Sequence, residues 1–321
     1  MRIFRRIEEF VPPEKGIALA LGRFDGVHPA HRALIGRTVE LAHQYHISPS
    51  CFSFYNSETP DPECPGWLTT SIEKAALISE IGIENLLYPD FDRPIIDLSP
   101  HEFLETLVIE RWKARIIVAG YDYRFGKNRS GDPDLLKTIS ESHGVIPVIF
   151  EPVLIDSVPV KATAIREMIS KGDVEQAIRL LGRPYSITGR IVEGRKLGKK
   201  MGFPTLNFRW PVSKVVPKFG VYAVRIGSEF FNENKSSFNA VASFGVSPTI
   251  DSSNRIMGLE VHVLDEIGVL ISGKPIPSDT DFKIEFISFI RPEEKFDSIE
   301  ELTRQISIDC DSARAMFKII Q

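Results

Sequence analysis

The sequence is poor in cysteine: its 321 residues include only Cys51, Cys64 and Cys310. The number is odd, the three residues lie far apart, and no Cys-x-x-Cys pair occurs. The spacing therefore suggests neither a disulfide framework nor a zinc site. Such sparse cysteine usage is typical of a reducing compartment, and we expect a cytoplasmic protein.

Long apolar runs are lacking as well. No stretch approaches the roughly 20 residues that a membrane-spanning helix needs. The basic N-terminus, residues 1–6, runs into Glu8 and Glu9 without the apolar core of a signal peptide. We therefore expect no membrane association.

A strong charge of either sign is also missing, because the formal net charge is −4 with 26% charged residues. This balance gives no overall attraction to nucleic acid or to an anionic membrane, and we expect no nucleic-acid partner. A hydrophobic content of 43% is ordinary for a globular protein. The length favours two domains, each large enough for its own core.

In the first half of the chain, short apolar runs alternate with segments of helical periodicity. We expect strands over residues 16–21, 49–55, 85–88, 115–119 and 145–150, and helices over about 30–45, 71–81, 100–112 and 135–142. This alternation predicts a parallel sheet with helices on both faces, in which ligands bind beyond the carboxyl ends of the strands.

Residues 22–31 lie between the first of these strands and its helix. Gly22 and Gly26 allow the backbone to approach a phosphate, the helix start offers unpaired N–H groups, and His28 and His31 add donors. We interpret this stretch as a phosphate-binding corner. The alternative is a glycine-rich turn with two surface histidines.

Two further segments carry polar side chains at expected strand or helix ends. Residues 120–126 follow a strand and combine glycines and aromatic rings with Asp122 and Arg124, so they form either a ligand loop or a packed turn. Thr163 and Arg166 begin another helix. They either hold a second anion or serve as a helix cap and a solvated cation.

Beyond about residue 183 the composition changes, and we expect domains over residues 1–183 and 184–321. Short strands are expected over residues 185–192, 220–226, 239–245, 259–264 and 282–290. Strands at this density indicate a small barrel or sandwich. A last helix starts near Ser298, with Glu301 in capping-box position.

Residues 194–202 hold four cations and three glycines, which we interpret as a phosphate-binding flap rather than a solvated basic loop. Just after it, the two-residue spacing of Thr205 and Asn207 puts both on one face of an extended chain. Glu260 and His262 likewise share the polar face of an alternating strand.

Together these motifs resemble the bacterial bifunctional riboflavin kinase/FAD synthetase family over nearly the whole chain. The family's Gly-x-Phe-Asp-Gly-Val-His-x-Gly-His corner matches residues 22–31, its flavin-side loop matches residues 122–126, its Ser-Thr-x-Ile-Arg segment matches residues 162–166, and its Gly-Phe-Pro-Thr-Ala-Asn motif matches residues 202–207. The resemblance implies a nucleotidyltransferase-type, Rossmann-like α/β domain followed by a small antiparallel β-barrel with a C-terminal helix.

The resemblance also implies the chemistry: phosphorylation of riboflavin to FMN and adenylylation of FMN to FAD, both from ATP with Mg²⁺. Taken with the patterns above, it suggests catalytic roles for Glu260, His28, His31 and Arg166; ATP or phosphate binding by Gly22, Phe24, Asp25, Gly26, Thr163, Gly198, Lys199, Gly202 and Pro204; flavin binding by Asp122, Arg124, Phe125 and Arg291; and magnesium binding by Thr205 and Asn207.

The chain departs from the family pattern at several positions. Ala30 and Ala162 replace a glycine and a serine, residues 54–60 lack the histidine of the family's Phe-x-Pro-His-Pro segment, and residues 271–273 lack an aromatic. Two alternatives follow from these departures. One is a riboflavin kinase with a degraded adenylyltransferase half, and the other is a flavin-binding regulatory protein without turnover.

Overall fold

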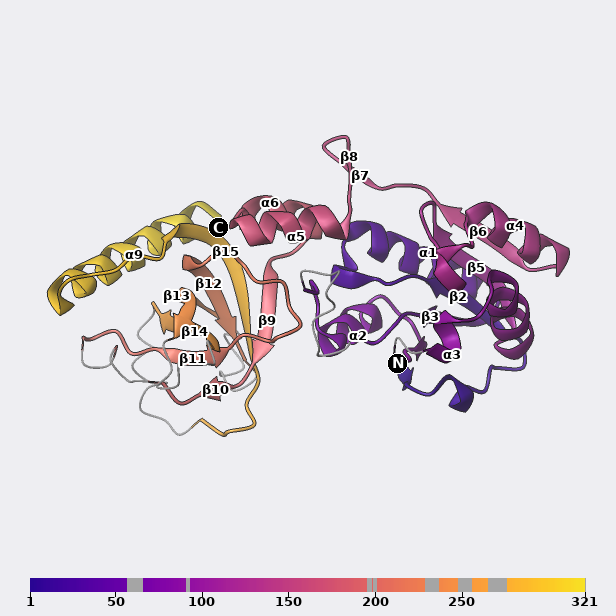
Figure 1. Cartoon of the computed structure of the whole chain (residues 1–321), viewed down its shortest axis with the longest axis horizontal. Coiled ribbons are helices and arrows are strands. Elements are labelled where there is room, and N and C mark those ends of the chain that lie inside the picture. The colour runs from indigo at the N-terminus through magenta and orange to yellow at the C-terminus, as the bar shows by residue number, and fades with distance from the viewer. Residues whose placement is uncertain are drawn as a thin grey trace. The chain divides into compact units, whose positions relative to one another are not determined.

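The computed structural model describes residues 1–56, 66–90, 93–194, 198, 201–228, 237–247, 256–264 and 276–320. The chain forms two compact units, Met1–Ala162 and Thr163–Gln321 (Figure 1). Each unit has its own sheet and its own hydrophobic core.

The first unit is built on a six-stranded sheet in which every pairing is parallel, as the alternation of the sequence predicts. Its strand order is β1 (Arg2–Phe4), β4 (Asn85–Leu87), β3 (Ser48–Phe52), β2 (Ile17–Leu21), β5 (Ala114–Gly120) and β6 (Ile146–Phe150). From β2 the chain adds strands on one side and then returns to add β5 and β6 on the other. The carboxyl ends of β2 and β5 therefore mark the switch point where such sheets bind ligands.

Helices cover both faces of this sheet. They are α1 (Pro29–Gln44), α2 (Ser71–Ser79), α3 (Arg93–Ile96), the π-helix η3 (Glu102–Arg111) and α4 (Pro133–Ser142). The unit also has three short 3-10 turns, η1 (Ile7–Glu9), η2 (Asp25–Val27) and η4 (Lys127–Arg129), and a hairpin of β7 (Leu154–Ile155) and β8 (Val158–Pro159).

Alternate residues of β2 pack into two different cores, because side chains alternate across a strand. Leu19 packs in the core that includes Leu104 of η3, and Ala20 in the core that includes Ile35 of α1.

The second unit is a seven-stranded antiparallel sheet that curls on itself (Figure 1). Its strand order is β10 (Ile191–Val192), β11 (Leu206–Arg209), β14 (Ile256–Val263), β13 (Ser237–Ser247), β12 (Gly220–Gly227), β15 (Phe282–Pro292) and β9 (Tyr185–Gly189), and its helices are α5 (Ala162–Lys171), α6 (Val174–Leu181) and α9 (Ile299–Ile320). This curled sheet with its C-terminal helix confirms the predicted β-barrel architecture.

Alternation along β12 explains how this sheet is covered. Tyr222 contacts the ring of Phe286 edge-on, with ring centroids 5.1 Å apart, inside the curl. Its neighbour Val221 instead joins the cluster that contains Ala313 and Phe317 of α9. The sheet thus buries an aromatic face within the curl and an aliphatic face under α9.

The start of α9 agrees with its predicted cap. The Ser298 hydroxyl accepts a bond from the Glu301 N–H at 3.1 Å, and the Glu301 carboxylate accepts one from the Asp297 N–H at 3.3 Å. The return bond therefore comes from one residue earlier than a regular capping box would use.

Candidate active sites

The corner after β2 has an unusual backbone. Phe24, Gly26 and Val27 all have positive φ, at 48°, 78° and 39°. A β-branched residue such as Val27 rarely adopts this conformation, and such strain costs on the order of 1–3 kcal/mol per residue. The corner therefore needs other contacts to hold it in place.

The carboxylate of Asp25 supplies those contacts. It accepts bonds from the backbone N–H of Leu68 at 3.0 Å and of Thr69 at 3.2 Å, and from the Thr69 hydroxyl at 3.2 Å. The same hydroxyl accepts a bond from the Gly26 N–H at 3.1 Å. Asp25, only 3% exposed, thus fixes the corner to the segment before α2. A role of this carboxylate in phosphate binding stays a prediction.

The two histidines of the corner lie together at the start of α1. Their rings stack with centroids 3.6 Å apart, and Nδ1 of His28 caps the helix by accepting a bond from the His31 N–H at 3.5 Å. Since Nδ1 is the acceptor, neutral His28 carries its proton on Nε2. The edge of Phe24 packs against the His31 ring at 5.3 Å. The arrangement offers imidazole donors beside the positive end of a helix dipole, as anion binding requires.

Gly22 is needed for the packing of this corner. A Cβ at Gly22 would lie 2.7 Å from ring carbons of Phe24, which is only 1% exposed. Any side chain at this position would displace the ring that supports His31.

We therefore expect Gly22→Ala to lower the free energy of unfolding by about 1–3 kcal/mol, the usual cost of overpacking a core. Gly36→Ala is the matched control, because a Cβ there meets nothing within 4 Å. In helix α1 that change should add about 0.5–1 kcal/mol. Urea unfolding followed by circular dichroism measures both, and equal stability of the two variants would contradict this role of Gly22.

The loop after β5 uses its aromatic residue for packing. Phe125 is 4% exposed, stacks on Tyr123 with ring centroids 5.7 Å apart, and pairs its backbone with Gly131. The charged residues of the loop are exposed instead. Asp122 forms an exposed ion pair with Lys161 at 3.8 Å.

Arg124 lies 3.3 Å from Asp132, in a similarly exposed pair. β2 and β5 are neighbouring parallel strands. The loop after β5 and the corner after β2 therefore lie side by side at the switch point of the sheet. Flavin contacts of Asp122, Arg124 and Phe125 stay predictions.

Thr163 and Arg166 lie in the first two turns of α5, at the start of the second unit. Thr163 is exposed and Arg166 half-buried, while Ile165 between them is fully buried. The predicted anion-binding roles of Thr163 and Arg166 stay predictions.

In the second unit, the pairing of β11 with β14 brings two predicted site residues together. Asn207 and Glu260 are direct cross-strand partners, and Ser243 of β13 flanks Glu260 on the other side. Directly opposed residues of antiparallel strands project to the same face about 5 Å apart. Glu260 is exposed, while Leu259 and Val261 beside it are fully buried, as the alternation predicts.

Glycines bring the predicted flap close to this pair. A Cβ at Gly194 would lie 2.3 Å from the amide of Asn207, and one at Gly198 would lie 2.3 Å from the carbonyl oxygen of Phe203. The Phe203 N–H in turn donates to the Gly198 carbonyl at 2.8 Å. The amide of Asn207 donates to the Thr205 carbonyl at 3.5 Å. Gly202 is exposed with φ at 85°.

His262 supports the same segment from β14. Its Nδ1 lies 2.9 Å from the Pro204 carbonyl, and its ring contacts Phe203 edge-on at 5.4 Å. Burial lowers the pKa of His262, against the opposing effect of the Pro204 bond. Neutral His262 therefore donates from Nδ1 and orients the turn that leads to Thr205.

A groove lies between this turn and α9. Met201, Phe203, Ile299, Glu300, Thr303, Arg304 and Ser307 line it. Ile299 is 66% exposed, so the groove presents an apolar side chain to solvent beside charged ones.

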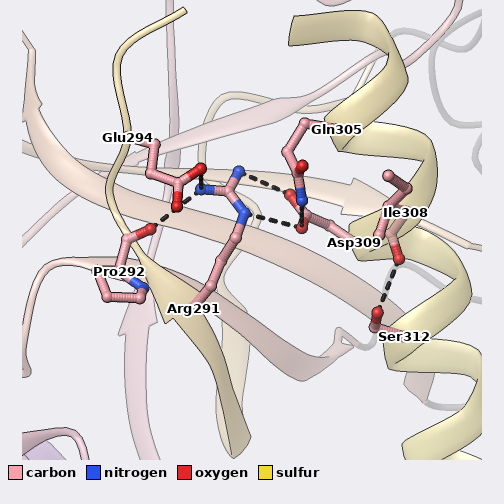
Figure 2. Close-up of polar contacts among 7 residues, drawn as sticks. All are labelled: Arg291, Pro292, Glu294, Gln305, Ile308, Asp309 and Ser312. Atoms are coloured by element: carbon pink, nitrogen blue, oxygen red, sulfur yellow. Dashed lines mark hydrogen bonds and ion pairs between the residues drawn. The ribbon is translucent and has the colours of Figure 1, made fainter. Parts of the chain in front are cut away.

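Arg291 is engaged by α9 (Figure 2). Its Nε and one terminal nitrogen donate to the two carboxylate oxygens of Asp309 at 2.9 and 2.8 Å, and the other terminal nitrogen donates to the Pro292 carbonyl at 3.0 Å. Gln305 adds a bond to Asp309 at 3.0 Å. The side chains of Arg291 and Asp309 are only 16% and 4% exposed. Arg291 thus fixes α9 to β15, and its predicted flavin contact stays a prediction.

Breaking this pair is expected to destabilise the second unit. Asp309→Ala leaves the Arg291 charge buried without its bidentate partner, which should cost about 3–5 kcal/mol in free energy of unfolding. Asp311→Ala removes an exposed ion pair of the same helix, formed with Arg314, and should cost about 0–1 kcal/mol. Denaturant unfolding of both variants checks this, and similar losses would contradict the anchoring role of Asp309.

Some predicted positions lie outside the described residues. They are Lys199 of the flap, the segment from residue 57 to residue 60 where the family's histidine is missing, Cys64, and residues 271–273. Within the described ranges, Cys51 and Cys310 are buried free thiols.

The described residues include no cluster of three or more histidine, cysteine or acidic side chains able to hold a metal ion. They also include no helix long and apolar enough to span a bilayer.

Known proteins are similar to both halves of this chain. A family model for riboflavin kinase matches residues 181–317, and one for FAD synthetase matches residues 11–164. A bifunctional riboflavin kinase/FMN adenylyltransferase of Pseudomonas fluorescens is 30% identical over 98% of both chains. One from Escherichia coli K12 is 31% identical over 99% of this chain and 98% of its own.

A crystal structure is also similar over nearly the whole chain. It is that of a protein named as a macrolide-efflux protein from Streptococcus pneumoniae, with a TM-score of 0.81 and 26% identity over 97% of this chain and 98% of that one. The fold of each unit is thus found in a solved structure.

Proposed function

Because this chain belongs to the family of bifunctional riboflavin kinase/FMN adenylyltransferases, we propose that its two units catalyse two successive reactions on one flavin. The chain phosphorylates riboflavin to FMN and adenylylates FMN to FAD, and ATP is the donor in both steps. The observation that carries the proposal is the cross-strand pair of Asn207 and Glu260. This pairing places Asn207, the predicted magnesium ligand, beside Glu260, the predicted general base.

In the kinase reaction, Glu260 accepts the proton of the terminal ribityl hydroxyl of riboflavin. That oxygen attacks the γ-phosphorus of ATP, the bond from this phosphorus to the bridging oxygen breaks, and ADP leaves. Glu260 is exposed, with Ser243 and Asn207 on either side, so substrate can approach this face of the sheet.

The residues beside Glu260 fit magnesium. The Thr205 hydroxyl and the Asn207 amide oxygen are hard donors, and magnesium is commonly held by few protein oxygens together with substrate phosphates and water. When bound there, magnesium neutralises charge on the transferring phosphate. The flap glycines Gly198 and Gly202, with Lys199 and Pro204, would cover the phosphates.

We place the flavin ring in the groove between Phe203 and α9. Met201, Phe203 and Ile299 supply apolar contact to the ring, and Glu300, Thr303, Arg304 and Ser307 of α9 add polar groups to the groove. This position lies beside the turn held by His262, and so near the β14 strand that carries Glu260.

In the adenylyl transfer, a phosphate oxygen of FMN attacks the α-phosphorus of ATP and pyrophosphate leaves. No protein nucleophile is needed, so the site acts by alignment and by charge stabilisation. Nε2 of His28 donates to the phosphates, with His31 and the N-terminus of α1 beside it. Gly22, Phe24 and Gly26 shape the corner, and Arg166 with Thr163 supplies further anion contacts.

We propose residues 1–183 as the adenylyltransferase domain and residues 184–321 as the kinase domain. α6 ends at Gly182, whose φ of 72° suits a glycine cap. Glu175 of α6 accepts a bond from Ser288 of β15, so α6 also packs on the second sheet. An ATP-consuming enzyme with free thiols fits the cytoplasm, and nothing in its chemistry calls for nucleic acid.

One assay tests the proposal. Purified protein is incubated with riboflavin, ATP and magnesium, and the flavin products are separated by chromatography. FAD is the expected product. FMN alone would indicate a kinase with an inactive first unit, and flavin binding without either product would indicate a regulatory protein.

A further inference from the structure

A buried lysine holds the corner from the side of α2. Lys74 is 1% exposed, and its Nζ donates to the carbonyl of Arg23 at 3.1 Å, the carbonyl of Phe54 at 2.8 Å and Oδ1 of Asn56 at 3.0 Å. An ammonium group has three N–H donors, and here each has an oxygen acceptor. The bonds join α2 to the segments that leave β2 and β3.

These acceptors are themselves fixed to the corner. The Arg23 carbonyl also accepts a bond from the Ser53 hydroxyl at 2.9 Å. The amide nitrogen of Asn56 donates to the Thr69 carbonyl at 3.0 Å, and the Thr69 hydroxyl accepts from the Gly26 N–H at 3.1 Å. Lys74 therefore stands at the centre of a network that ends on the strained backbone of the corner.

The charged and titratable groups facing Lys74 come from three segments: the corner, β3 and the residues after β4. Burial lowers the pKa of Lys74 to about 7, Asp25 and Cys51 act to raise it, and Arg23 acts to lower it further. Burial also raises the pKa of the Cys51 thiol and of the Tyr88 phenol, so both are neutral. The Tyr88 ring lies 5.1 Å from Nζ. Asp25 is thus the facing carboxylate that favours the ammonium form.

Loss of the proton changes what Lys74 can hold. A neutral amine has two N–H donors and a lone pair, and it faces three oxygen acceptors. One of the three oxygens then loses its bond and faces the lone pair. Because the acceptors lie on both the β2 and the β3 exits, their relative placement loosens when the amine is neutral.

We propose that protonated Lys74 is a positioning residue for adenylyl transfer, holding the Arg23 backbone so that His28 and His31 meet the phosphates of ATP. The inference rests on the proposed adenylyl transfer. ATP binding in the first unit weakens as rising pH removes this proton, while riboflavin phosphorylation in the second unit does not depend on it.

Folding stability responds to the same proton in the opposite direction. The folded-state pKa of Lys74, about 7, lies below its usual 10.5, so the unfolded chain holds the proton more tightly. Between these two values the contribution of Lys74 to stability therefore rises with pH, and it is lost as the pH falls toward 7. A loss of ATP affinity across this window cannot be a loss of folding caused by Lys74.

The first test uses the wild-type chain. The KM for ATP in the conversion of FMN to FAD is measured from pH 7 to pH 9, with riboflavin phosphorylation by the same protein as the internal control. If only the protonated form is competent, apparent affinity falls with its fraction, and the KM should rise at least about tenfold. kcat, and the KM for ATP in the kinase reaction, should each change about twofold or less.

Variants then assign the effect to Lys74. Lys74→Met should show at pH 7 a KM at least as high as that of the wild type at pH 9, without pH dependence. Lys137→Met, at an exposed lysine of α4, is the matched control and should follow the wild-type profile. Asn56→Asp puts a carboxylate against Nζ, although it loses the bond to the Thr69 carbonyl, and should move the rise in KM to higher pH by about one unit or more. That shift would assign the pH dependence of the KM to Lys74 even if Lys74→Met fails to fold.

The outcomes separate this inference from the proposed function. FAD formation with a KM independent of pH, or a Lys74→Met variant that keeps the wild-type profile, overturns the role of Lys74 alone. A wild-type chain that makes no FAD overturns both.

Discussion

Glu260→Gln is expected to lower the rate of FMN formation from riboflavin by about 10²–10⁴, the usual contribution of a general base. The amide has nearly the shape of the carboxylate but cannot accept the ribityl proton. Glu260 lies on the exposed face of β14, so the variant should keep its strand pairing with Asn207. Conversion of supplied FMN to FAD takes place in the other unit and should continue at the wild-type rate.

Initial rates by chromatography, with riboflavin or FMN as the starting flavin, measure the two reactions separately. Glu285→Gln on β15 is the matched control, because Glu285 forms an ion pair with Lys283 on the same sheet and has no role in the proposed site. Kinase turnover retained by Glu260→Gln would show that Glu260 is a surface residue only.

His28→Ala is expected to abolish FAD formation from FMN while leaving riboflavin phosphorylation intact. Removing one preorganised donor to developing charge costs about 10²–10³ in rate. His28 also caps α1, and loss of a cap costs about 0.5–2 kcal/mol in stability. Alanine removes both functions at once.

His28→Asn separates them, because asparagine is a favoured cap but lacks the imidazole. It should be more stable than His28→Ala, because the cap is kept, and should still lose FAD formation. His43→Ala, in the last turn of α1, controls for loss of a histidine elsewhere in that helix. A His28→Asn variant with normal FAD yield would remove His28 from the mechanism.

Periodicity predicted most of the fold because most elements are long enough to show it. The apolar run before Gly22 became β2, and the three- to four-residue spacing that follows became α1. The alternation around Glu260 placed Leu259 and Val261 in the core. These patterns reflect one-sided burial, which sequence displays directly.

Two short strands and the strand pairings were not predicted. β1 has three residues and adds a sixth strand at the sheet edge, and β11 has four. Runs this short contain too few residues for a period to show. The pairing of Asn207 with Glu260 joins residues far apart in the chain, and the spacing of each in its own strand does not give the register between them.

The burial of charged residues was also not predicted from the sequence. Lys74 and Asp309 lie on helices, where a charged residue is ordinarily a solvated one, yet both are almost fully buried. Lys74 is bonded to two backbone carbonyls and the Asn56 side chain, and Asp309 is bonded to Arg291. The only sequence signal is a charged residue at helical spacing from apolar ones, as Lys74 is from Ile78.

The most direct test of the central claim, that each of the two proposed domains, residues 1–183 and 184–321, carries its own complete catalytic site, is a mixing experiment. Glu260→Gln and His28→Asn proteins are incubated, separately and together, with riboflavin, ATP and magnesium, and FAD is quantified by chromatography. We expect almost no product from Glu260→Gln alone, FMN from His28→Asn alone, and FAD from the mixture. A mixture that stops at FMN would contradict two independent sites linked by FMN.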